Sequence, residues 1–102
     1  MKLSDPPLQI HRRRPLVRVG ARSVRLTPVE HELIVALGML DNKLATHQLL
    51  LDVMTDGCVQ IPADQQVLWN RIDRLRRKIG PEHLRGRPYH GYMLVGDVRF
   101  VE

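Results

Sequence analysis

The stretch DQQVLWNRIDRLRRKIG, residues 64–80, decides the fold of this chain. Its apolar residues recur at three- and four-residue spacing, so Leu68, Ile72, Leu75 and Ile79 form one narrow stripe along a helix. Gly80-Pro81 ends that helix, because glycine is favoured just past a C-terminus and proline cannot continue the hydrogen-bond ladder. The stretch therefore predicts an amphipathic helix that begins at Ala63 or Asp64 and packs its stripe into a core.

The opposite side of this helix is polar and strongly cationic. Its members are Gln66, Asn70, Asp73, Arg74 and Arg77, with Arg71 and Lys78 on one flank and Trp69 and Arg76 on the other. Asp73 is expected to pair with Arg77 one turn later, since residues four apart are neighbours on a helix. Trp69 stands beside the apolar stripe, where it either stacks on a sugar of a polyanionic partner or supports the helix by packing, and the position favours packing. Such a face either binds a polyanion or is simply solvated, and the surrounding pattern has to decide.

Two more helices are predicted upstream. Thr27-Pro28-Val29-Glu30 combines an N-cap hydroxyl, a proline at the first helical position and a glutamate at the third, which together satisfy unpaired backbone amides. That first helix is expected to end at Asp41-Asn42. Thr46 is expected to cap a second helix over residues 47–54, followed by a loop from Thr55 to Pro62.

Short strands flank the helices. Residues 16–19 and 23–26 alternate apolar and polar side chains around a turn at residues 20–22, which predicts a hairpin. Residues 8–14 are expected to form an edge strand or an extended lead-in, because Pro15 interrupts them. After the third helix, residues 83–87 and 92–95 predict a second hairpin, and residues 98–101 a last strand.

This order of elements is typical of a winged helix. The expected fold is α+β, a winged helix-turn-helix with N-terminal antiparallel strands, three helices and a C-terminal hairpin wing. A chain of 102 residues has room for one core, so residues 1–102 are expected to form one domain with residues 1–15 as lead-in or edge strand.

Three motifs resemble the effector domain of OmpR/PhoB-type response regulators. The first-helix motif Leu-Thr-x-x-Glu is met by residues 26–30, the third-helix motif Ile-x-x-Leu-Arg-x-Lys-Leu by residues 72–79 with Ile79 in the last position, and the wing motif Gly-Tyr-x-Leu by residues 91–94. The resemblance covers about residues 16–95. Most members also carry a receiver domain, which the residues before the first helix are too few to form, so the expectation is an effector domain without its receiver.

The resemblance implies a sequence-specific DNA-binding transcription regulator, with the third helix in the major groove and the wing at the adjacent minor groove or backbone. Arginine forks match guanine edges and side-chain amides match adenine edges. The expected base-reading residues are Gln66, Asn70 and Arg74. The expected backbone contacts are Arg71, Arg76, Arg77 and Lys78. The expected wing contacts are Arg85, Arg87, Tyr89 and His90. Family wings usually have an arginine and a glycine where this chain has Pro88 and Tyr89, so Arg85 or Arg87 is expected to replace that arginine.

Charge supports a polyanionic partner. The net charge is +5, and thirteen of the sixteen cations are arginine, whose planar fork binds phosphate in a bidentate manner. The charge is also segregated. Residues 1–27 contain seven basic and one acidic residue, residues 28–66 contain one basic and six acidic residues, and residues 67–102 contain eight basic and four acidic residues. If about five cations meet phosphates, log affinity should fall with log salt at a slope of roughly −4 to −5.

A second interpretation assigns the domain to protein interaction. It docks on RNA polymerase or another regulator through the acidic middle segment or the Thr55–Pro62 loop, a loop that contacts polymerase in the resembled family. Members of that family tend to bind direct repeats as dimers, so a homodimer on DNA is a further expectation.

Several function classes are disfavoured. The histidines lack the three- or four-residue spacing of a helical metal site, and no glycine-rich phosphate loop or nucleophile elbow is present, so neither an enzyme nor a metal or other cofactor is expected. No apolar run is long enough to span a membrane. The single Cys58 and the lack of a secretory signal favour the cytoplasm.

Overall fold

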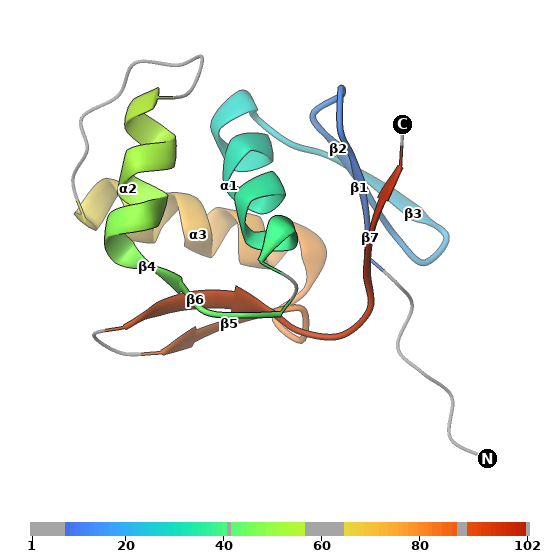
Figure 1. Ribbon diagram of the computed structural model, residues 1–102. Helices are drawn as coiled ribbons and strands as arrows, with labels where there is room; N and C mark the ends of the chain where they lie inside the picture. The colour runs from blue at the N-terminus through green and yellow to red at the C-terminus, as the bar shows by residue number, and fades with distance from the viewer. Residues whose placement is uncertain (1–7, 41, 57–64, 88–89, 102) are drawn as a thin grey trace.

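The computed structural model describes residues 8–40, 42–56, 65–87 and 90–101 (Figure 1). The elements follow in the order β1 (Leu8–His11), β2 (Leu16–Val19), β3 (Arg22–Arg25), α1 (Pro28–Met39), β4 (Ala45–Thr46), α2 (His47–Asp56), α3 (Gln65–Ile79), β5 (Leu84–Arg87), β6 (Gly91–Leu94) and β7 (Val98–Val101). The predicted order of strands, three helices and a C-terminal hairpin is confirmed.

The predicted caps are present at α1 and α2. Thr27 Oγ1 accepts a hydrogen bond from the Glu30 amide at 3.2 Å, and Glu30 Oε1 accepts one from the Thr27 amide at 2.9 Å. Thr46 Oγ1 accepts from the Leu49 amide at 3.1 Å, which satisfies one free amide at the start of α2. Local sequence thus fixes where both helices begin.

The N-terminal sheet has the strand order β3-β2-β1-β7. β1 pairs antiparallel with β2, and it also pairs parallel with β7 from the C-terminus, with Ile10 opposite Phe100. The prediction that residues 8–14 form an edge strand or lead-in is therefore wrong for β1, which lies inside the sheet. Pro15 does not interrupt it, because the strand ends at His11.

The second sheet has the order β4-β6-β5, and its β5–β6 hairpin is the wing. β4 comes just before α2 and pairs with β6, with Ala45 opposite Tyr92 and Thr46 opposite Gly91. Gly91 has φ +154°, and a Cβ there would stand 1.9 Å from the Ala45 carbonyl oxygen. Only glycine lets these two backbones approach so closely, so Gly91 attaches the hairpin to the helices.

The core lies between the three helices and the two sheets. The predicted stripe of α3 is fully enclosed: Leu68, Ile72, Leu75 and Ile79 are each at most 1% exposed. They pack in one cluster with residues such as Leu33 and Leu37 of α1 and Leu50 of α2. Burial of that stripe turns the opposite face of α3 outward. Among the described residues, no helix is long and apolar enough to cross a membrane.

Candidate nucleic-acid interface

The outward face of α3 carries the three residues predicted to read bases. Gln66, Asn70 and Arg74 are all exposed. Gln66 Nε2 lies 3.4 Å from Asn70 Oδ1, a long hydrogen bond one turn apart that holds the two amides side by side. Two amides and a guanidinium on consecutive turns present the donors and acceptors that base edges require.

The acidic residue on this face is neutralised locally. Arg77 Nη2 lies 2.9 Å from Asp73 Oδ2, which confirms the predicted pair one turn apart. The two side chains are 78% and 49% exposed, so the pair adds little stability, but it removes a negative charge that would repel phosphate.

Arg76 lies against the wing. Its Nε donates to the Leu84 carbonyl of β5 at 3.2 Å, and its guanidinium stands next to Gly86 and Tyr92. Burial raises the pKa of Tyr92, and the nearby positive charge of Arg76 opposes this rise. Arg76 therefore joins α3 to the hairpin. Its role as a phosphate ligand stays a prediction, and a phosphate would have to compete with these contacts.

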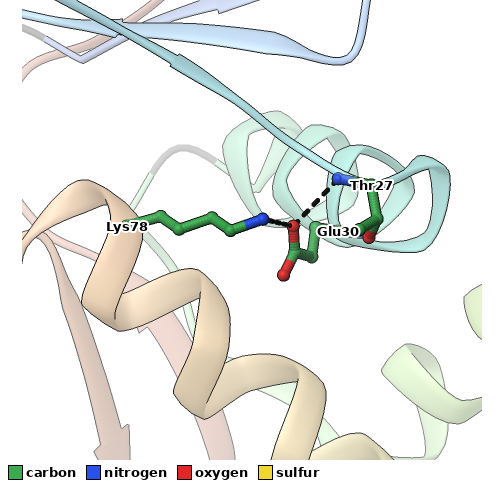
Figure 2. A network of polar contacts seen from close by, with 3 residues as sticks. All are labelled: Thr27, Glu30 and Lys78. Carbon is green, nitrogen blue, oxygen red and sulfur yellow. Dashed lines mark hydrogen bonds and ion pairs between the residues drawn. The ribbon is translucent and has the colours of Figure 1, made fainter.

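Lys78 also has an intramolecular partner. Its Nζ donates to Glu30 Oε1 at 2.6 Å, and the same oxygen accepts from the Thr27 amide (Figure 2). Glu30 is 1% exposed and Lys78 34% exposed, so the ammonium group reaches inward across the gap from α3 to α1. Its predicted phosphate contact likewise remains untested, and the ion pair competes with it.

Arg71 is half-buried and remains on the flank of α3. Arg22, which sequence reasoning did not single out, donates from its Nη2 to the Lys78 carbonyl at 3.4 Å and so brings another cation to the end of α3. The sequence offered no signal for this contact, because the two residues are far apart in the chain.

The wing contributes two exposed side chains, Arg85 and His90. The side chain of Arg87, the whole of Tyr89, and the predicted Thr55–Pro62 loop beyond Asp56 lie outside the described residues. Thr55 and Asp56 belong to α2 rather than to a loop.

Trp69 departs from expectation. It is 63% exposed, so the predicted packing role beside the apolar stripe is wrong. The stripe and Val67 fill the contact between α3 and the core, and Trp69, about a quarter-turn from the centre of the stripe on the other side, is left outside.

Comparison with known proteins gives the same fold. No protein-family model matches the chain, and no curated protein matches it. Among solved structures, the C-terminal domain of the nisin resistance regulator NsrR, a lantibiotic response regulator, has a TM-score of 0.75 and 25% identity, covering 92% of this chain and 96% of that chain.

Two further structures hold DNA. The Klebsiella pneumoniae RstA DNA-binding domain, in complex with the RstA box, has a TM-score of 0.72 and 19% identity, covering 91% of this chain and 95% of that one. The DNA-binding domain of the response regulator AdeR, in complex with an intercistronic region, has a TM-score of 0.73 and 20% identity, covering 93% and 99%. These likenesses confirm the winged-helix fold and the resemblance to response-regulator DNA-binding domains.

Proposed function

We propose that this chain is a sequence-specific DNA-binding domain of a transcription regulator that places α3 in the major groove. The observation that carries the proposal is the outward face of α3, where Asn70 and Arg74 are exposed directly opposite a fully buried stripe. A helix supported in this way by α1 and α2 can enter a groove without losing its own packing.

In this proposal the side chains fall into three groups, which read bases, contact phosphates or contact DNA beside the wing. Arg74 reads a guanine through O6 and N7, and Asn70 or Gln66 reads an adenine through N6 and N7. Arg71 and Arg77 contact phosphates, which fix the register but carry no sequence information directly. Arg85 and His90 contact the backbone or the minor groove beside the wing.

Solved structures with this fold and a DNA duplex support the proposal, as does the excess of arginine. Docking on RNA polymerase and pairing of two copies on DNA remain predictions.

The test is selection of bound duplexes from a random-sequence library, followed by gel-shift titration of the enriched duplex. The Arg71→Ala/Arg74→Ala variant is expected to lose most of its affinity. The matched control is Arg18→Ala/Arg25→Ala, which removes the same charge from exposed positions on the face of the N-terminal sheet opposite Arg22, the strand residue that contacts α3. A library that yields no enriched sequence, or equal losses for the two double variants, would overturn the proposal.

A further inference from the structure

Trp69 is the one strongly exposed aromatic side chain among the described residues, and nothing in the fold explains its exposure. It is 63% exposed, whereas Tyr92 is buried and Phe100 packs against the core. Exposed tryptophan is uncommon, and aromatic residues are enriched where a surface meets a partner.

Helical spacing places Trp69 on the wing side of α3. Arg76 follows it by seven residues, which returns a helix to nearly the same side. Because Arg76 bonds Leu84 of β5 and lies beside Gly86, that side of α3 looks toward the hairpin. In Figure 1 the β5–β6 hairpin extends beneath α3 from the C-terminal end of that helix. Trp69 therefore lies two turns nearer the start of α3, on about the same side of the helix as Arg76.

The charges on α3 and on the wing indicate which kind of partner covers the Trp69 indole. Asp73, one turn after Trp69, is neutralised by Arg77, while Arg74 and Arg85 are exposed on the helix and on the wing. An exposed indole on this cationic helix suits a partner with apolar patches set within negative charge. The sugar-phosphate backbone of DNA has this character.

Resting on the proposed function, we propose that Trp69 packs its indole against a deoxyribose of the DNA strand that runs between α3 and the β5–β6 hairpin. With α3 in the major groove and the hairpin at the adjacent minor groove, one backbone has to pass between them. The indole face covers sugar C–H groups, and its Nε1–H can donate to a phosphate oxygen.

Two properties distinguish this contact from those of the arginines. A sugar contact carries no sequence information directly, so its loss weakens binding to all sequences alike. Trp69 carries no charge and releases no counterion, so its loss leaves the salt slope unchanged.

The experiment uses the only tryptophan of the chain as its own reporter. Titration with a short mixed-sequence duplex at low salt is followed by anisotropy of a labelled duplex and, separately, by tryptophan emission. The emission is expected to shift to shorter wavelength or to be quenched in step with binding. Trp69→Ala is expected to bind about tenfold more weakly, equivalent to ~1.4 kcal/mol, with an unchanged salt slope, and Trp69→Phe to recover part of this loss.

Met39→Ala is the control, since Met39 is also a large exposed apolar residue but lies on α1. It is expected to bind as the parent does. If the duplex binds while tryptophan emission stays constant, or if Trp69→Ala binds as the parent does, the Trp69 contact is refuted and the proposed function stands. If no duplex binds the parent chain at all, both fail. Because the emission measurement needs no substitution, it tests the Trp69 contact even if a variant folds poorly.

Discussion

Lys78 Nζ lies 2.6 Å from Glu30 Oε1, and this ion pair joins the last turn of α3 to the first turn of α1 (Figure 2). The same carboxylate completes the capping box with Thr27. One buried carboxylate therefore completes the cap of α1 and holds the last turn of α3 against it. A contact outside the proposed DNA-facing surface thus helps to hold α3 in place.

We expect Lys78→Met to lower the free energy of unfolding by about 1–3 kcal/mol, because it leaves the Glu30 carboxylate buried without a counter-ion. The loss is smaller than for a fully enclosed pair, since Lys78 is partly exposed. Urea unfolding at neutral pH measures it. In Glu30→Gln/Lys78→Met the loss should be smaller than the sum of the two single losses by about 1 kcal/mol. Strict additivity would show that the pair does not stabilise the fold.

Arg74 and Arg77 should differ in what they contribute to DNA binding. Arg74→Ala is expected to weaken binding to the preferred duplex and to relax the choice at one base pair by about 1–3 kcal/mol. Arg77→Ala should weaken all duplexes alike and reduce the steepness of the salt dependence by about 0.9. Gel-shift titrations of single-base variants of the duplex at several salt concentrations measure both effects. If the two phenotypes are exchanged, the assignment of base and phosphate contacts is wrong.

The sequence predicted well what depends on neighbours along the chain. The capping box of α1, the apolar stripe of α3 and the Asp73–Arg77 pair all lie within a few turns of one helix, where spacing determines geometry. These patterns were enough to place the helices and the outward face.

Contacts between distant parts of the chain could not be predicted in this way. The parallel pairing of β1 with β7 joins the two ends of the chain, and no local pattern encodes it. Arg76 and Lys78 look like free cations in the sequence, yet they bond Leu84 and Glu30 respectively, because α3 packs between the wing and α1. Tertiary packing, which spacing does not specify, decides which cations of a basic helix remain available.

Gly91→Ala should detach the wing from β4. An alanine Cβ would stand 1.9 Å from the Ala45 carbonyl oxygen, so the β4–β6 pairing has to open or shift. We expect the free energy of unfolding to fall by at least about 2 kcal/mol. This loss exceeds the roughly 1 kcal/mol that a strained backbone alone would cost.

Gly96→Ala is the matched control, because Gly96 also has a positive φ, +94°, but a Cβ there would meet no heavy atom of the described residues within 4 Å beyond its chain neighbours. Thermal and urea unfolding of the two variants separate the steric effect from the conformational one. Equal losses in both variants would mean that the close approach to Ala45 does not matter.

Tyr92 should make the fold sensitive to alkaline pH. Burial raises the pKa of Tyr92 above its ordinary value of 10.0, although the Arg76 charge opposes the rise. The phenol thus loses its proton more readily in the unfolded chain, so stability is retained below about pH 10 and falls as pH rises beyond it. Tyr92→Phe keeps the ring that packs against His47, with centroids 5.5 Å apart in the parent, but it cannot ionise. Urea unfolding between about pH 8 and 11 should show a steeper loss for the parent than for this variant. Parallel pH profiles for the two proteins would show that the buried phenol does not cause the alkaline loss.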